Sequence, residues 1–306
     1  MKPKVSDRIT IILTTFNRRE VLLETLETLK GVLPYNKILI CDDASTDKTY
    51  ETVSGAFSEV RWIINKSNKG LIASRNTLMK AVSTEYVISL DDDANFLNPD
   101  ALEDAIDFMD LYQDCSILSF RLFWGLDLPK QIDTSESYYR VKNFLGGAHL
   151  MRLQSWKECI KAYPAWYTFY GEEDYASLKL FQRKWKIFYY PDVLIHHRVS
   201  VSLRKNQETD WDLRSRRSLH ASWSNYLIFY PRELAYKKIL YSIKEQLRIK
   251  FIKGDFKILK ALFLAAFDLN RFSDKRKKLN TRLTKTEIRS YLKMREAPIY
   301  WRVEDE

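Results

Sequence analysis

Short apolar runs alternate with helical segments over residues 8 to 90, and this alternation limits the fold more than any other feature of the chain. β-Branched apolar runs predict strands, and apolar residues spaced three or four apart predict the helices between them. The predicted strands cover 8–16, 37–41, 60–64 and 85–90, and the predicted helices cover 17–31, 48–57 and 70–82. Strands joined by single helices require right-handed crossovers, so we expect an α/β fold with a mostly parallel sheet flanked by helices.

The rest of the chain divides into two further parts. Residues 115–205 show a less regular mixture, with strands predicted at 116–124 and 185–197 and helices near 154–162 and 173–182. Beyond Arg204 we expect no strands, because charged residues opposite apolar ones predict helices at 211–229, 232–253 and 255–269. The sequence therefore predicts an α/β body followed by a C-terminal helical extension over 206–306.

The composition is that of an ordinary globular protein. Apolar residues make up 45% of the 306 residues, and only 8 Gly and 8 Pro are present, which excludes collagen-like and linker-like chains. Cys41, Cys115 and Cys159 are far apart and form no CxxC pair, so we expect no disulfide framework or thiolate zinc site, and a reducing compartment. No secretory leader pattern or membrane-spanning apolar run is visible, so we expect a cytoplasmic protein.

The positive charge is concentrated near the C-terminus. Residues 236–283 hold 14 Lys and Arg against 4 Asp and Glu, which equals the whole net charge of +10. Such a segment favours an anionic partner, which can be nucleic acid, a membrane surface or an acidic substrate. Its basic residues are interleaved with Ile, Leu and Phe at helical spacing, which favours peripheral attachment to the inner face of a membrane. An internal helical pack or a homodimer interface is the alternative.

Three adjacent carboxylates, Asp91, Asp92 and Asp93, follow the strand predicted at 85–90. Adjacent carboxylates repel one another unless a cation or hydroxyl groups compensate, and Mg²⁺ and Mn²⁺ prefer oxygen ligands. Ligands of parallel sheets bind beyond the carboxyl ends of the strands, where this triplet and the polar residues after Leu13 and Cys41 fall. The alternative is a solvated acidic turn that caps a helix beginning at 98–100.

Four motifs occur in order at the predicted strand–helix junctions. They are Thr14-Thr15-Phe16-Asn17, Asp42-Asp43-Ala44-Ser45-Thr46-Asp47, Asn68-Lys69-Gly70 with Arg75-Asn76, and Asp91-Asp92-Asp93. Together they resemble the nucleotide-binding half of the inverting family 2 glycosyltransferases with the GT-A fold, over about residues 8–100. The chain departs from that family in lacking the usual proline, where Leu13 or Thr14 stands, and in having Phe16 where tyrosine is usual.

The resemblance implies a set of donor-binding residues and a metal ligand. The donor-binding residues are Thr14, Phe16, Asp43, Arg75, Asp91 and Asp92. Asp43 would accept from the N3–H group of the base and Asp91 would meet the ribose, since carboxylates accept well from imides and hydroxyls. Asp93 would hold Mn²⁺ or Mg²⁺, which neutralises a departing diphosphate. A helix N-cap network is the alternative for Asp42.

A second group of polar residues lies between 144 and 198. Gly171-Glu172-Glu173-Asp174 resembles the ED motif of the same family, in which a carboxylate removes the proton from the acceptor hydroxyl. Asp174 is our first choice as the base and Glu173 the second, because either could face the cleft. Acidic residues in a first helical turn are also ordinary partners of the helix dipole, which is the alternative.

The same resemblance implies two more features. His196 or His197 would complete the metal site, and strand alternation sends their rings to opposite faces, so at most one ring should point at the cation. Gly147, with Gly146, and Trp166 would form walls of the acceptor site, since an aromatic plane packs well on a sugar. A lone tryptophan such as Trp166 is more often a core residue, which is the alternative.

The resemblance implies transfer of a sugar, with inversion, from a UDP or dTDP sugar to a saccharide or lipid-linked saccharide. The implied division is a nucleotide-sugar half at 1–114, an acceptor and catalytic half at 115–205, and a basic helical extension at 206–306, as in rhamnosyltransferase-type members that build bacterial surface polysaccharide. A sugar-nucleotide pyrophosphorylase would need a Gly-rich loop where TTFNRRE stands. A nucleic-acid binder is the remaining alternative, and we expect no nucleic-acid partner.

Overall fold

The computed structural model describes residues 4–133, 135–200, 208–279 and 281–302. Its sheet begins with four parallel strands in the order β3-β2-β1-β4. These strands are β1 (Ile9–Thr15), β2 (Ile38–Asp42), β3 (Arg61–Ile64) and β4 (Tyr86–Leu90). The helices between them are α2 (Arg19–Thr28), α3 (Thr49–Ala56) and α4 (Leu71–Ala81). The alternation predicted over residues 8–90 is therefore confirmed.

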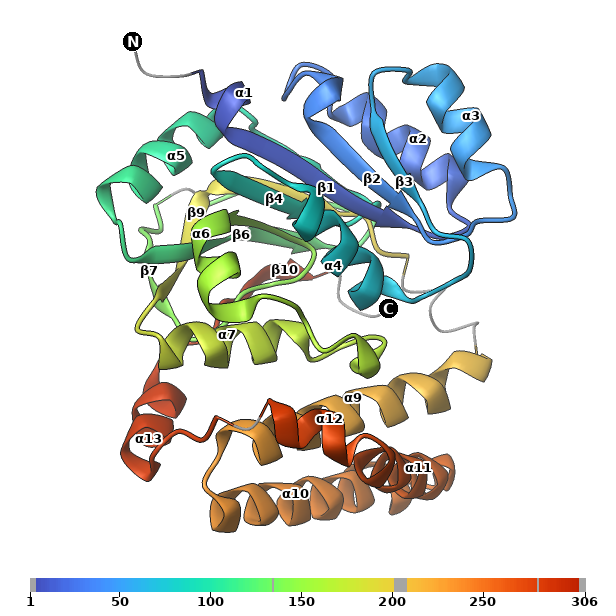
Figure 1. The fold of residues 1–306 in the computed structure, drawn as a ribbon, viewed down its shortest axis with the longest axis vertical. Coiled ribbons are helices and arrows are strands. Elements are labelled where there is room, and N and C mark those ends of the chain that lie inside the picture. Colours follow the sequence, from blue (N-terminus) through green and yellow to red (C-terminus); the bar gives the residue numbers. More distant parts are fainter. Residues whose placement is uncertain (1–3, 134, 201–207, 280, 303–306) are drawn as a thin grey trace.

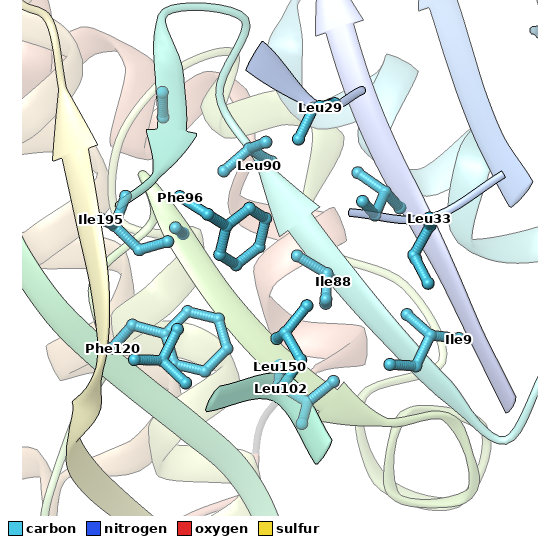
Figure 2. Close-up of a cluster of buried hydrophobic side chains, with 14 of the residues drawn as sticks. Ile9, Leu29, Leu33, Ile88, Leu90, Phe96, Leu102, Phe120, Leu150 and Ile195 are labelled. Atoms are coloured by element: carbon cyan, nitrogen blue, oxygen red, sulfur yellow. The ribbon is translucent and has the colours of Figure 1, made fainter. Parts of the chain in front are cut away.

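The strands are apolar on both sides because helices cover both faces of the sheet. In β1, Ile9, Ile11 and Leu13 point into one core cluster and Ile12 into the other, as the period of two requires. The first cluster includes residues of α2 and of α5 (Ala101–Leu111), and the second includes residues of α4 and α7 (Glu172–Gln182). Figure 2 shows part of the first cluster, where Phe96 and Phe120 lie beside Ile88 and Leu150.

The second half of the sheet mixes strand directions. Its strands are β5 (Ala94–Phe96), β6 (Cys115–Trp124), β7 (Tyr139–Val141), β8 (Ala148–Arg152) and β9 (Lys186–His197). β8 runs antiparallel between β4 and β6, while β6 and β9 are parallel. Short helical turns lie before β1 and β2, namely α1 (Val5–Arg8) and η1 (Tyr35–Lys37), and after β8, namely α6 (Leu153–Ser155), η2 (Trp156–Ile160) and η3 (Ala165–Tyr167). The two strands predicted between 115 and 205 are thus present as β6 and β9.

The C-terminal segment forms a helical layer along one side of the α/β body (Figure 1). Its elements are α9 (Glu208–Phe229), α10 (Arg232–Gln246), η4 (Leu247–Phe251), α11 (Lys257–Arg271), α12 (Ser273–Lys278) and α13 (Lys285–Lys293). α9 packs against α7 on one side and carries α10 and α11 on the other. No helix among the described residues combines the length and the apolar character needed to cross a membrane.

The expectation that strands end at Arg204 is wrong. β10 (Ile299–Arg302) returns to the body and pairs in parallel with residues 122–124 of β6. Tyr300 lies over the guanidinium of Arg121 at 4.4 Å and against the ring of Phe123 at 5.3 Å. A four-residue strand is too short to show a clear periodicity, and its partner lies far away in the sequence, so the sequence alone did not reveal it.

Candidate active site

The polar residues that follow β1, β2 and β4 meet at one edge of the sheet, as predicted from the direction of the strands. The Asp43 amide donates to the carbonyl of Thr15 at 2.9 Å, which joins the ends of β1 and β2. The Asp91 amide donates to the carbonyl of Gly147 at 2.9 Å, which joins the end of β4 to the start of β8. This edge is the place where an α/β sheet binds its ligands.

Asp91, Asp93 and His197 form a compact cluster of potential metal ligands at this edge. His197 Nε2 lies 2.9 Å from Asp93 Oδ1 and 3.6 Å from Asp91 Oδ2, and one ligand atom from each residue falls within 4.8 Å of the others. The cluster forms because β5 pairs with β9 and sets Ala94 opposite His197. Two carboxylates and an imidazole fit a divalent cation such as Mn²⁺ or Mg²⁺.

The two adjacent histidines point in opposite directions, as strand alternation requires. His196 Nε2 lies 2.9 Å from the carbonyl oxygen of Gly125, on the side away from the cluster. The structure therefore does not bring His196 to the metal-binding position that was one of the two predicted. It also groups Asp91 with the ligands, whereas the sequence implied a contact with the ribose.

Arg18 is a residue beside the cluster that sequence reasoning missed. Its Nη2 donates to Asp93 Oδ2 at 2.7 Å, and its Nε lies 3.1 Å from Asp92 Oδ1. Burial raises the pKa of Asp92 to about 7, opposed by the Arg18 charge and assisted by the Asp93 charge. Burial acts to raise the pKa of Asp93 as well. The hydrogen bond and charge of His197 and the ion pair with Arg18 outweigh it and hold this pKa well below the usual value. Asp93 is therefore the charged member of the pair.

Arg75 lies in the interior, and its expected role in donor binding stays a prediction. Its guanidinium is 3.2 Å from Asp91 Oδ1 and 3.2 Å from Glu172 Oε1, and both Arg75 and Glu172 are almost completely buried. Removing a charged group from water costs free energy, so buried charged groups are paired with opposite charges. Arg75 thus connects the carboxylate cluster after β4 with the first turn of α7. The acidic start of α7 was the only sequence signal for Glu172.

Glu173 contacts Gly146, and Asp174 does not. A Cβ atom on Gly146 would lie 2.1 Å from Glu173 Oε1, so the carboxylate rests directly against this glycine, next to the backbone that touches His197. Burial and the charge of Glu172 raise the pKa of Glu173. Asp174 makes no such contact: burial and the Glu173 charge raise its pKa to about 6, and its charge acts on tyrosines of the C-terminal helices. The contact with Gly146 therefore favours Glu173 over Asp174 as the base, and the assignment stays a prediction.

Gly147 lies against the potential metal ligands, and its expected place in an acceptor wall stays a prediction. A Cβ atom there would stand 2.9 Å from His197 Nδ1. Gly147→Ala should therefore displace His197 and weaken Mn²⁺ binding by about 10- to 100-fold, the usual cost of disturbing the support of a metal ligand. Calorimetric titration with Mn²⁺ measures this. Gly55→Ala is the control, because its Cβ meets nothing within 4 Å, and unchanged Mn²⁺ affinity in Gly147→Ala would contradict the expectation.

The remaining residues predicted to bind the donor, Thr14, Phe16 and Asp43, differ in exposure. Phe16 is 43% exposed at the carboxyl edge of β1, and Thr14 is half-buried beside it. Asp43 is buried, and its oxygens accept from Asn65 Nδ2 and from the backbone amides of 69 and 70. It organises the loop before α4, and its contact with a base stays a prediction.

Trp166 belongs to a packed aromatic cluster, which favours the core alternative over an acceptor wall. Its ring lies 4.5 Å from Tyr167, 5.4 Å from His220 and 5.5 Å from Phe272, measured between ring centres. These partners come from α9 and the end of α11 as well as from its own turn. Trp166 therefore joins the C-terminal helical layer to the segment that leads into α7.

The comparison with known families agrees with this geometry. Residues 10–157 match the family described as Glycosyl transferase family 2. The chain contains a family 2 glycosyltransferase domain. The resemblance that rested on four motifs is thereby confirmed, and the match continues beyond them through β8.

Curated relatives of this family 2 domain align over part of their length. EpsE of Bacillus subtilis, whose name describes a glycosyltransferase, is 30% identical over 122 residues, which are 38% of this chain and 42% of that protein. WfaP of Escherichia coli, named a UDP-Glc:alpha-D-GlcNAc-diphosphoundecaprenol beta-1,3-glucosyltransferase, is 32% identical over 88 residues, 28% of this chain and 35% of WfaP. The chain spans less than half the length of these relatives.

Solved structures establish the GT-A fold for the family 2 domain and the segments of the chain that adjoin it. S. aureus TarS 1–349, in complex with UDP-GlcNAc, superposes with a TM-score of 0.57 at 16% identity, over 89% of this chain and 83% of that one. The mannosyltransferase PcManGT from Pyrobaculum calidifontis, in complex with GDP-Man and Mn²⁺, superposes with a TM-score of 0.53 at 16% identity, over 87% and 75%. The predicted fold class is confirmed.

Proposed function

We propose that this protein transfers a sugar, with inversion, from a nucleoside diphosphate sugar to a hydroxyl group of a saccharide or lipid-linked saccharide. The observation that carries the proposal is that the potential metal ligands lie close to the Glu173 carboxylate. Asp91, Asp93 and His197 lie on one side of the Gly146-Gly147 backbone, and Glu173 rests against Gly146. A transferase of this kind needs a cation site for the leaving diphosphate and a carboxylate for the acceptor within one cleft.

In the proposed reaction, Asp91, Asp93 and His197 would hold Mn²⁺ or Mg²⁺. The cation, when bound, would neutralise charge on the departing diphosphate. Glu173 would take the proton of the acceptor hydroxyl as its oxygen bonds to the anomeric carbon. The bond from that carbon to the diphosphate oxygen breaks, and its electron pair leaves with the diphosphate. One displacement at the anomeric carbon inverts its configuration.

Three side chains would support these steps. Arg75, held between Asp91 and Glu172, would fix the spacing between the two carboxylate groups. Arg18 pairs with Asp92 and Asp93 and is 40% exposed, so its side chain could turn to a donor phosphate when a cation takes its place. Phe16 would stack on the base at the open edge of β1.

The names of the related proteins guide the choice of substrates. WfaP is named as acting on a diphosphoundecaprenol acceptor, and TarS was solved with UDP-GlcNAc. We therefore propose a UDP or dTDP sugar as donor and a lipid-linked saccharide as acceptor, met at the inner face of the membrane by a peripheral, cytoplasmic protein. Residues 1–114 would bind the donor, 115–205 would bind the acceptor, and 206–306 would support both.

A direct test measures nucleoside diphosphate release from a panel of UDP, dTDP and GDP sugars, with a polyprenyl diphosphate saccharide as acceptor and with Mn²⁺ or EDTA. We expect release from one donor class, dependent on both the acceptor and Mn²⁺, and an inverted linkage by NMR. Retention of configuration, or transfer that is unaffected by EDTA, would contradict the mechanism.

The proposed base predicts the direction of the pH dependence. Glu173 acts only when deprotonated, and its pKa lies above the ordinary value of about 4.3 because of burial and the Glu172 charge. kcat/KM should therefore fall as the pH is lowered through this raised pKa, well before an ordinary glutamate would be protonated. Initial rates across a pH series check this. A kcat/KM that stays constant down to about pH 5 would contradict it.

A further inference from the structure

α11 has apolar residues on two opposite faces. Ile258, Ala261 and Ala265 form its inner face and pack against α9 together with Trp223. Leu259, Phe263 and Phe267 lie on the opposite face and are 46%, 70% and 55% exposed. A surface helix normally carries polar residues on the face turned away from its core. The second apolar face of α11 therefore needs an explanation.

Exposed apolar side chains also lie on α10, on η4 and between η4 and α11. We define the outer face as the exposed large apolar side chains between 236 and 267: Tyr236, Leu240, Tyr241, Ile249, Ile252, Phe256, Leu259, Phe263 and Phe267. They are nine of the seventeen such side chains found in the described part of the chain. Exposed apolar side chains that gather in this way mark a surface that binds another body. In Figure 1, α10 and α11 lie on the side of α9 that is turned away from α7.

The charge of the same segment identifies the partner. Residues 236–283 hold 14 basic against 4 acidic residues, and three of the acidic groups are occupied by basic partners: Glu245 by Arg248, Asp268 by Arg216 and Asp274 by Lys277. Exposed lysines stand among the apolar side chains at 237, 244, 253, 257 and 260. Two copies of this surface would repel each other, whereas an anionic lipid surface complements both its charge and its apolar groups.

We propose that the outer face of α10, η4 and α11 docks on an anionic lipid bilayer. Phe, Leu and Ile would enter the headgroup region, the tyrosines would lie at the interface, and the lysines would meet lipid phosphates. This inference deepens the peripheral membrane location in the proposed function by naming the surface that would bind lipid. Its test measures lipid binding alone, so its failure would leave the proposed sugar transfer untouched.

Docking at this surface would also fix the position of the active site relative to the bilayer. α9 lies between the outer face and α7. Asn225 of α9 donates to the carbonyl of Gly171 at 3.0 Å and accepts from the Tyr167 hydroxyl at 2.7 Å. Gly171 is the N-cap residue of α7, directly before Glu172 and Glu173. The helical layer thus connects the docking surface to the first turn of α7 through described contacts.

The test is co-sedimentation of the full chain with vesicles of phosphatidylcholine alone or mixed with phosphatidylglycerol, at low and high salt. We expect binding to the mixed vesicles that weakens with salt. Lys253→Glu with Lys257→Glu and Lys260→Glu should reduce the partition coefficient by at least about 100-fold, since each lysine near an anionic surface contributes about a factor of five. Phe263→Ser with Phe267→Ser should weaken binding at both salt concentrations.

Matched controls separate the effect of the outer face from the effect of changing charge or apolar surface anywhere on the protein. Lys30→Glu with Arg61→Glu and Lys80→Glu makes the same change in net charge at exposed positions of the α/β body, and Leu111→Ser with Leu292→Ser removes exposed apolar groups elsewhere. Both controls should bind vesicles as the parent does, with thermal melts confirming that all variants fold.

Three outcomes would overturn the proposal. One is the absence of binding to phosphatidylglycerol vesicles at low salt, and another is an equal loss of binding in the body controls. The third is a different partner: a dimer in sedimentation equilibrium that Phe263→Ser with Phe267→Ser dissociates, or tight RNA or DNA binding that the lysine variant abolishes while vesicles are not bound.

Discussion

Glu173→Gln should lower the turnover number by a factor on the order of 10² to 10⁴ and leave nucleotide affinity nearly unchanged, as expected when a general base is removed. The substitution keeps the size of the side chain and its contact with Gly146, so the cleft should keep its shape. Steady-state rates with donor and acceptor measure turnover, and calorimetry with UDP measures affinity. A loss of nucleotide affinity equal to the loss of turnover would show that Glu173 acts on the donor side instead.

Asp174→Asn is the matched control for this prediction. Asp174 follows Glu173 directly, but its charge acts on Tyr226, Tyr230 and Tyr291 of the C-terminal helices. We expect turnover within a few-fold of the parent. If Asp174→Asn abolished turnover and Glu173→Gln did not, the assignment of the base would have to be exchanged.

Asp93→Asn should abolish the part of nucleotide binding that depends on Mn²⁺. Asp93 contacts both His197 and Arg18 and is held in its charged form, so the amide removes the charge that a cation would bind. Calorimetric titration with UDP and dTDP, with and without Mn²⁺, measures the effect. Asp192→Asn makes the same chemical change at an exposed position of β9 and should have no effect. Undiminished Mn²⁺-dependent affinity in Asp93→Asn would remove Asp93 from the site.

The sequence predicts best what depends on neighbouring residues. Strand–helix alternation is local, so the positions of β1 to β4 and their helices follow from it, and the direction of parallel strands then gathers the motifs at one edge. The orientation of the two histidines follows from the same rule, because successive side chains of a strand point to opposite faces. The structure has His197 at Asp93 and His196 at Gly125.

What the sequence does not predict depends on contacts between distant segments. Arg75 and Glu172 are separated by 97 positions, so nothing in either motif shows that they form a buried ion pair. Glu173 and Asp174 are neighbours on a helix and differ in direction by a rotation of about 100°. Only the packing of α7 against Gly146 and α9 decides which of the two faces the cleft.

The pairing of β10 with β6 has a consequence for how the chain reaches its folded state during synthesis. β8 covers one edge of β6 at residues 117–119, and β10 covers the same strand at 122–124. Until β10 has left the ribosome, the end of this strand has an unpaired edge, which is a template for aggregation. The basic helices are made first, so a ribosome that stalls within them would release a protein with an open sheet. Because β10 is synthesised late and pairs with a distant strand, closure of the sheet should be slow. A chain interrupted before β10 would keep the open edge of β6.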